Sequence, residues 1–257
     1  MGKSDILVII PARGGSRGIP NKNIRSFCGL PLIAHTIKQA LDLKKSGYIN
    51  RVVVATDSRA IASVAISHGA EVPWLLPQRL TKPKSPVLDS ILYTTDKLNK
   101  KEKYCPDYLL ILQAVVPLRS KQDIIRCIKK TKDRSIDAVV TVCPTHPLLV
   151  RLSVNHRLSF LNIAEFKNTN RQTMLTSFKL NGFTYIIKPN ILSTQKTFFP
   201  KQTAAVICDP WRAIDIDHPE DWALAESVFK NRKKIENIIN AMTAEKNLLL
   251  LKTKTSL

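Results

Sequence analysis

The sequence predicts an α/β fold, in which a mostly parallel sheet is covered by helices on both faces. Apolar runs of strand length recur along the 257 residues, and segments with helical apolar spacing separate them. This alternation is typical of parallel sheets, because parallel strands need long crossover connections. A hydrophobic fraction of 44% over this length is enough for a sizeable core.

Uninterrupted apolar runs predict strands that are buried on both faces of the sheet. The four clearest runs span residues 6–10, 52–55, 108–112 and 138–142, and later runs lie at 183–187 and 213–216. Apolar residues three and four apart predict helices that begin near residues 31, 58, 89, 121 and 219. Asp57 or Ser58 is the predicted cap of the second helix, and Gly69 is the predicted stop.

Two segments depart from this alternation. Residues 144–179 carry prolines, scattered polar residues and short apolar pieces, which favour an inserted hairpin, lid or subunit contact. Residues 230–257 form a strongly basic tail with seven Lys and Arg against two Glu. We therefore expect one domain over residues 1–229, followed by the tail.

The net charge of +20, from 40 Lys and Arg against 20 Asp and Glu, is the one extreme of composition. It favours a polyanionic partner, such as nucleic acid, an anionic membrane or a phosphorylated small molecule. Aromatic residues make up only 6% of the chain, and it has neither a helix-turn-helix nor a zinc pattern. A nucleic-acid-binding protein is therefore the less favoured alternative.

Two further features predict a soluble, cytoplasmic protein without a membrane partner. No apolar run approaches the ~20 residues that span a bilayer, and the first residues show no signal-peptide pattern. The five cysteines are scattered and include no Cys-x-x-Cys pair. Such cysteines fit a reducing compartment better than a disulfide framework or a zinc module.

The densest chemical pattern is the basic, glycine-rich segment 11–23 directly after the first strand. Glycines at positive φ can turn backbone N–H groups inward to bind phosphate oxygens, and three nearby cations match a nucleoside triphosphate. The segment is neither a Walker A loop nor G-x-G-x-x-G. An exposed basic turn is the alternative. The glycines and cations are Gly14, Gly15, Gly18, Arg13, Arg17 and Lys22.

A pair of carboxylates, Asp215 and Asp217, is the second pattern. On a strand these side chains would face the same side ~6–7 Å apart and could converge on Mg²⁺. Asp217 could instead cap the last helix together with Glu220. Capping would leave Asp215, which stands between isoleucines, as a costly unpaired charge.

Three polar residues could face an anionic substrate. Gln113 stands at the carboxyl end of the third strand, where ligands of parallel sheets bind. Arg171 and Asn181 could add a guanidinium and an amide, although surface turns explain both equally well.

The chain resembles the acylneuraminate cytidylyltransferases, which are the CMP-sialic acid synthetases and their CMP-legionaminate and CMP-pseudaminate relatives. The most similar segments are IPARGGSRG at residues 10–18 and KNI at 22–24. The similarity covers about residues 5–229 and leaves the tail outside. It continues in order through residues 31–37, 54–58, 69–73, 112–113, 117–119, 171–172, 180–182 and 214–217.

The resemblance implies a Rossmann-like, nucleotide-diphospho-sugar transferase-like fold and a homodimer with its contact in residues 144–179. It implies a magnesium-dependent reaction in which a 2-keto-3-deoxy sugar acid attacks the α-phosphate of CTP. The products would be a CMP-sugar and pyrophosphate, and the sugar acid would be of the sialic, legionaminic or pseudaminic type.

The resemblance also implies residue roles, position by position. Asp215 and Asp217 would hold Mg²⁺, and Arg13 and Lys22 would join Asp215 as the catalytic residues. The sugar acid would face Gln113, Arg171, Lys179 and Asn181. The nucleotide would contact Ala12, Arg13, Gly14, Gly15, Ser16, Arg17, Lys22, Asn23 and Ser85.

Two departures from the family pattern concern substrate selection. Ala114-Val115-Val116 stands where relatives have Pro-Thr-Ser, and Leu76 stands where relatives have an arginine near the base. Arg79 could reach back to replace that arginine. A catalytically altered homologue is therefore a further alternative.

Overall fold

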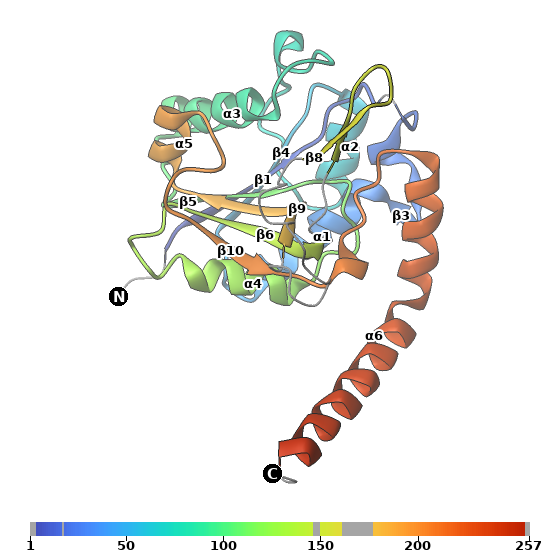
Figure 1. The fold of residues 1–257 in the computed structure, drawn as a ribbon. Helices are drawn as coiled ribbons and strands as arrows, with labels where there is room; N and C mark the ends of the chain where they lie inside the picture. The colour runs from blue at the N-terminus through green and yellow to red at the C-terminus, as the bar shows by residue number, and fades with distance from the viewer. Residues whose placement is uncertain (1–3, 17, 146–149, 161–176, 255–257) are drawn as a thin grey trace.

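The computed structural model describes residues 4–16, 18–145, 150–160 and 177–254 of the chain. One six-stranded sheet lies at its centre, with the strand order β10-β6-β9-β5-β1-β4 (Figure 1). β9 runs antiparallel to both of its neighbours, and the other pairs are parallel, which confirms the predicted mostly parallel sheet. The strands are β1 (Ile6–Pro11), β4 (Arg51–Ala55), β5 (Tyr108–Leu112), β6 (Ala138–Thr145), β9 (Ser177–Ile187) and β10 (Thr203–Ile207).

Helices cover both faces of this sheet, as predicted. α1 (Leu32–Lys45), α2 (Arg59–Ser67) and α4 (Lys121–Lys130) contribute to one buried apolar cluster. α3 (Val87–Glu102) and α5 (Pro189–Gln195) contribute to a second cluster. In Figure 1, α3 and α5 lie above the sheet and α4 lies below it. Both faces of the strands are therefore removed from water, which explains their continuous apolar sequences.

Short elements connect these layers. Ser58 caps α2 by accepting a hydrogen bond from the backbone N–H of Ile61, so Ser58 rather than Asp57 is the cap. Gly69 follows that helix with a φ of +88°, as a helix-ending glycine does. The remaining short elements before β6 are η1 (Lys22–Ile24), β2 (Ser26–Phe27), β3 (Leu30–Pro31) and η2 (Gln78–Leu80).

The predicted strand at residues 213–216 is wrong. β10 occupies the sheet edge beside β6 instead, and residues 213–217 form an irregular connection after η5 (Pro210–Arg212). Ile214 and Ile216 are apolar because they pack in a third cluster with Phe27 and the last helix. A sequence pattern of buried alternate residues cannot separate such packing from a strand.

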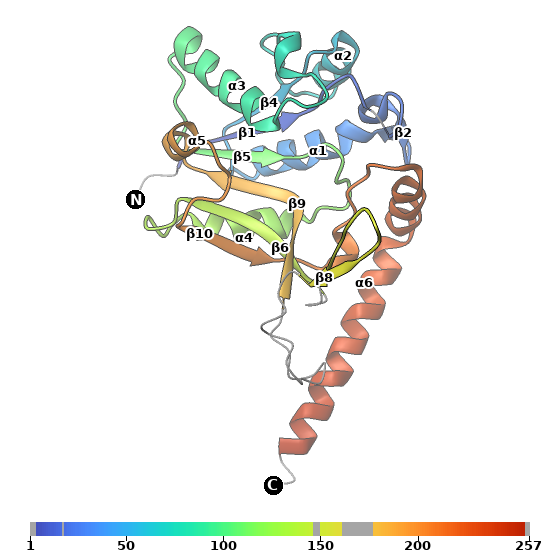
Figure 2. The same cartoon turned by 45° about the horizontal axis from the view of Figure 1, so that its top comes forward.

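The last helix, α6 (Pro219–Lys254), is longer than predicted. It runs through residue 229 without a break, so the basic tail continues this helix (Figures 1 and 2). An antiparallel hairpin of β7 (Val150–Leu152) and β8 (Leu158–Phe160) lies within the irregular segment. Among the described residues, no helix combines the length and apolarity needed to cross a bilayer.

Candidate active site

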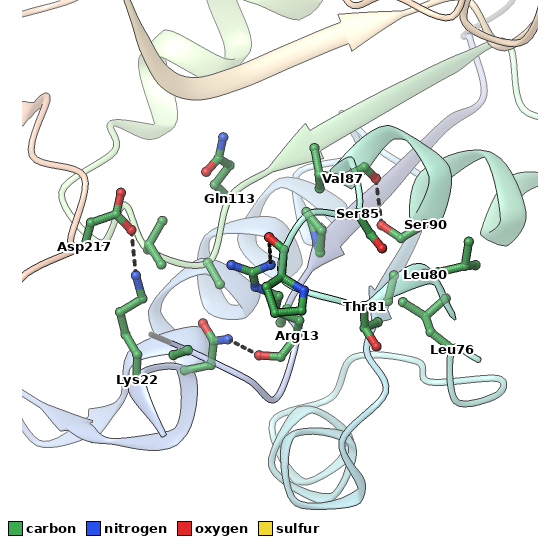
Figure 3. Close-up of a pocket in the computed structure, with 18 of the residues that line it drawn as sticks. Arg13, Lys22, Leu76, Leu80, Thr81, Ser85, Val87, Ser90, Gln113 and Asp217 are labelled. Carbon is green, nitrogen blue, oxygen red and sulfur yellow. Dashed lines mark hydrogen bonds and ion pairs between the residues drawn. The ribbon is translucent and has the colours of Figure 1, made fainter. Parts of the chain in front are cut away.

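A cavity of about 580 Å³ opens beyond the carboxyl ends of β1 and β5. The glycine-rich segment forms one wall, the connection between η2 and α3 forms another, and Gln113 follows β5 (Figure 3). Arg13, Lys22 and Asp217 all line this cavity. The structure therefore brings the cations of segment 11–23 and one predicted acidic residue to a single site.

The geometry of segment 11–23 differs from the prediction in one respect. Gly14, Gly15 and Gly18 do not have positive φ. The N–H of Gly14 donates to the Asp57 carboxylate at 2.8 Å, and the Asn23 amide donates to the carbonyl of Arg13 at 3.1 Å. These two bonds fix the loop to its surroundings.

Gly18 is required because the backbone passes very close to the acidic segment. A Cβ at Gly18 would lie 2.0 Å from the carbonyl oxygen of Asp217, whereas a Cβ at Gly15 would have no neighbour within 4 Å. The missing side chain at Gly18 thus lets the basic loop and the acidic segment approach each other.

We expect Gly18→Ala to displace the acidic segment and to lower thermal stability and activity together. Relief of the overlap requires a backbone shift, for which a cost of ~1–3 kcal/mol is typical. Gly15→Ala is the matched control, and it should leave the melting temperature nearly unchanged. Equal melting temperatures for the two variants would contradict the close approach at Gly18.

Lys22 joins the basic loop to the acidic segment. Its ammonium donates to the carbonyl oxygen of Ile216 at 2.5 Å and to Oδ1 of Asp217 at 2.8 Å. The Lys22 side chain is 10% exposed and the Asp217 side chain 64% exposed, so the pair lies at the cavity wall with its carboxylate open to solvent. Figure 3 shows the two side chains pointing toward each other.

Asp217 does not cap α6. The carboxylate of Asp221 accepts hydrogen bonds from the backbone N–H groups of Asp217 and His218, at 3.1 and 2.8 Å. Asp221 therefore performs the capping that the sequence offered to Asp217 and Glu220. The Asp217 carboxylate remains available to the cavity.

Asp215 is half-buried, and its Oδ1 is a buried atom without a hydrogen-bond partner among the residues that the structure describes. Burial and the negative charge of Asp217 raise the pKa of Asp215 to about 6, although the nearby Lys22 ammonium opposes that rise. Gly182 leaves space here, because a Cβ there would lie 3.7 Å from both the Asp215 carboxylate and the Gln113 amide nitrogen. Asp215 thus lies near Gln113, but it is not among the residues that line the cavity, so it stands behind the cavity wall.

The two carboxylates fit a divalent cation. An unpartnered buried oxygen and a raised pKa both mark Asp215 as a group that would gain from a bound cation. In the described part of the chain, no cluster of three His, Cys, Asp or Glu could form a complete metal site. A cation here would take its other ligands from water or from substrate oxygens, as Mg²⁺ commonly does.

The raised pKa of Asp215 predicts a pH-dependent stability. The folded protein holds this proton up to about pH 6, whereas an unfolded Asp releases it near pH ~4. Stability from this group is therefore present below pH ~4 and lost as the pH rises toward 6, by up to ~3 kcal/mol.

Urea unfolding without divalent ions tests this expectation. The unfolding free energy of Asp215→Asn minus that of the wild type should grow by ~2–3 kcal/mol between pH 4 and 7. A difference that is constant over this range would contradict the assigned pKa shift.

The other predicted residues are distributed unevenly. Lys179 is exposed on β9 and is not among the residues that line the cavity. Asn181 is buried in the sheet, where its Oδ1 accepts hydrogen bonds from the Thr141 hydroxyl and the Phe183 N–H. Arg17 and Arg171 lie outside the described residues. Residues that do line the cavity include Ala12, Ser16, Asn23 and Ser85.

Sequence reasoning missed three charged residues at the site. Lys82 lines the cavity beside Pro83, whose carbonyl accepts a hydrogen bond from Arg13. Asp57 holds Gly14, and the buried Arg119 donates to the carbonyl oxygen of Gln113 at 2.8 Å. Lys82 stands in a loop that only the fold brings to the cavity, whereas Arg119 follows Gln113 in the loop after β5 and does not itself line the cavity.

Residues from both departures from the family pattern line the cavity. Ala114 and Val115 line it, and so does Leu76. The guanidinium of Arg79 lies 5.8 Å from the centre of the Tyr93 ring, and Arg79 does not line the cavity. This wall is therefore more apolar than the family pattern implies.

Known proteins are similar to this chain in sequence. A profile described as Cytidylyltransferase matches residues 7–149, more than half of the chain. The chain is 34% identical over 232 residues to the CMP-N,N'-diacetyllegionaminic acid synthase of Legionella pneumophila, with 88% of this chain and 96% of that protein covered. It is 34% identical to a pseudaminic acid cytidylyltransferase of Campylobacter jejuni, with 87% and 96% covered.

A solved structure is similar in fold. A CMP:2-keto-3-deoxy-manno-octonic acid synthetase complexed with CTP has a TM-score of 0.66 to this chain at 16% identity. The similarity covers 89% of this chain and 100% of that one. At this identity the likeness concerns the fold, which agrees with the sheet and helix layers described above.

Proposed function

The chain belongs to the cytidylyltransferase family, and from that premise we propose that it joins CMP to a sugar acid. The substrates would be CTP and a 2-keto-3-deoxy sugar acid of the sialic, legionaminic or pseudaminic type. The products would be the CMP-sugar and pyrophosphate. Relatives that are 34% identical carry names for legionaminic and pseudaminic acid activation, which supports this substrate class.

One observation carries the proposal: the basic loop and the acidic segment meet at one cavity. Lys22 contacts Asp217 directly, and Arg13 lines the same space. A triphosphate placed there would meet the cations of Arg13 and Lys22 and the carboxylate of Asp217, with the Asp215 carboxylate behind the cavity wall. Such carboxylates repel a phosphate unless a divalent cation lies between them, so the site fits a metal–nucleotide complex.

The chemistry requires positioning and charge compensation more than covalent help. The sugar hydroxyl oxygen forms a bond to the α-phosphorus, the bond to the bridging oxygen of the β-phosphate breaks, and pyrophosphate leaves. The hydroxyl proton is released to water. Arg13 and Lys22 compensate the negative charge that develops on the phosphate oxygens, and donors aimed in advance at such charge are effective.

We propose that Asp215 and Asp217 hold Mg²⁺ at this site. The unpartnered Oδ1 of Asp215 and the solvent-facing carboxylate of Asp217 support this assignment. When bound, Mg²⁺ would neutralise phosphate charge and orient the leaving group. Asp215 supplies the buried, fixed oxygen, whereas Asp217 also keeps Lys22 in place.

Nucleotide and sugar acid would occupy different parts of the cavity. Ala12, Ser16, Asn23 and Ser85 would surround the nucleotide, and Gln113 would face the sugar acid near Asp215. Arg171 would pair with the sugar carboxylate, as the family resemblance implies. The apolar wall at Leu76 would favour the flat face of a base over a charged group.

We also propose a homodimer formed through the irregular segment. Large apolar side chains are exposed on β7, β8 and β9, where a monomer would normally bury or avoid them. The exposed apolar residues are Val150, Leu152, Leu158, Phe178 and Leu180.

A reducing, cytoplasmic location agrees with five free cysteines.

Pyrophosphate release tests the proposed reaction directly. The purified protein is incubated with Mg²⁺, each of the four nucleoside triphosphates and a panel of nonulosonic and octulosonic acids. We expect release only with CTP and a nonulosonic acid. Release with no pair would point to a catalytically altered homologue, and octulosonic acid alone as substrate would contradict the substrate class.

A further inference from the structure

The second half of α6 projects away from the body of the molecule (Figures 1 and 2). The Arg212 guanidinium of η5 forms an ion pair with the Glu236 carboxylate at 2.9 Å, and this pair holds the helix to the body at that point. Every residue from 236 to 245 is exposed. This part of α6 therefore has a free surface around its whole circumference.

One side of that helix is apolar. Ile235, Ile238, Ile239 and Met242 follow the i, i+3, i+4, i+7 spacing that places side chains on one stripe. Ile238 is 48% exposed, Ile239 is 37% exposed and Met242 is 65% exposed. Covering such a stripe with an apolar surface removes it from water, which lowers the free energy of the helix.

The stretch 235–245 carries two Glu and no Lys or Arg, and the cations of α6 lie before and after it. Arg232 and Lys234 lie at the two edges of the apolar stripe, and Lys230 and Lys233 lie on the opposite side. Residues 230–257 carry seven Lys and Arg against two Glu. An apolar stripe bordered by cations is the pattern of a helix that lies in a membrane interface.

We propose that α6 binds an anionic lipid surface, with its apolar stripe in the headgroup boundary and the bordering Arg232 and Lys234 against lipid phosphates. Two copies of this helix packed in parallel would bring two basic segments side by side, and like charges at close range oppose that arrangement. Nucleic acid would attract the cations but would leave the apolar stripe in water. An anionic bilayer covers the stripe and neutralises the cations at the same time.

This mode of binding differs from a membrane span. A span needs an apolar run longer than any in the sequence, and none of the described helices is long and apolar enough to cross a bilayer. A helix lying on the surface needs only a stripe, so the expectation of no membrane partner is revised for α6.

Vesicle co-sedimentation of the full chain tests the proposal. The probes are phosphatidylcholine vesicles and phosphatidylcholine vesicles that contain phosphatidylglycerol. We expect binding to the anionic vesicles only, with release at ~1 M salt, where the Debye length falls to ~3 Å. The double variant Ile238→Gln with Met242→Gln should weaken binding at least tenfold, because glutamine keeps the helix but removes the apolar stripe.

A matched double variant, Asn240→Gln with Ala244→Gln, changes the opposite side of the helix and should bind like the wild type. Circular dichroism checks that both variants remain helical. If the double variant Ile238→Gln with Met242→Gln bound anionic vesicles as tightly as the wild type, the proposal would be overturned, because charge attraction alone would then account for the binding. The proposal also fails if vesicles do not bind, or if that variant instead dissociates a dimer on size-exclusion chromatography.

Discussion

Replacing Arg13 with alanine is expected to lower the rate of CTP-dependent pyrophosphate release by a factor of ~10²–10³. Arg13 lines the cavity, and among the described residues its guanidinium donates one hydrogen bond, to the carbonyl oxygen of Pro83 at 3.3 Å. It is therefore available to compensate negative charge that develops on the triphosphate. Removal of one such donor typically costs ~3–4 kcal/mol of transition-state stabilisation.

The stability of this variant should stay within ~0.5 kcal/mol of the wild type, because the Arg13 side chain is exposed. Arg59→Ala is the matched control, since Arg59 is also exposed but lies on α2, outside the cavity. Single-turnover rates of the wild type, Arg13→Ala and Arg59→Ala separate a loss of catalysis from a general effect of removing an exposed arginine. A rate for Arg13→Ala within a few-fold of the wild type would remove Arg13 from the phosphate site.

Asp215→Asn is expected to abolish magnesium-dependent pyrophosphate release while leaving the protein folded. Asparagine has nearly the same shape, but it lacks the negative charge that would hold Mg²⁺ at the site. The variant should be at least as stable as the wild type at pH 7, because the buried, unpaired Oδ1 carries part of a costly charge. Loss of activity with retained stability distinguishes a functional role from a structural one.

Asp96→Asn provides the matched control for that variant. Asp96 forms an exposed ion pair with Lys100 on α3, far from the acidic segment in sequence, and its loss should change neither rate nor metal dependence. The measurement is the initial rate across a magnesium titration. An unchanged magnesium dependence in Asp215→Asn would show that another group holds the cation.

Much of the fold follows from local sequence. β1, β4 and β5 are almost wholly apolar because helices cover both of their faces, with Arg51 at the start of β4 as the charged exception, and the runs at 6–10, 52–55 and 108–112 predict them well. β10 escaped prediction because Thr203–Ile207 is a short edge strand in which four of the five residues are only partly buried or exposed. Ile214 and Ile216 suggested a strand because a loop that packs on α6 has a similar apolar pattern.

In the site, too, some residue positions follow from the local sequence and the strand order, whereas others depend on contacts between residues far apart in the chain. The proximity of Gln113 to the basic loop follows from parallel topology, since both lie beyond the carboxyl ends of neighbouring strands. The role of Asp57 does not follow from topology, because its hydrogen bond from the Gly14 N–H joins residues 43 positions apart. Likewise, nothing local distinguishes the buried Arg119 from a surface arginine.

The central claim is that the loop cations and the acidic pair share one nucleotide and one divalent cation. Calorimetric titration of CTP with Mg²⁺ and with EDTA tests it most directly. We predict that Mg²⁺ tightens CTP binding to the wild type at least about tenfold, or ~1.4 kcal/mol, and that Asp215→Asn loses only this increment. Arg13→Ala should bind CTP more weakly under both conditions. A full magnesium increment in Asp215→Asn, or unchanged affinity in Arg13→Ala, would contradict the claim.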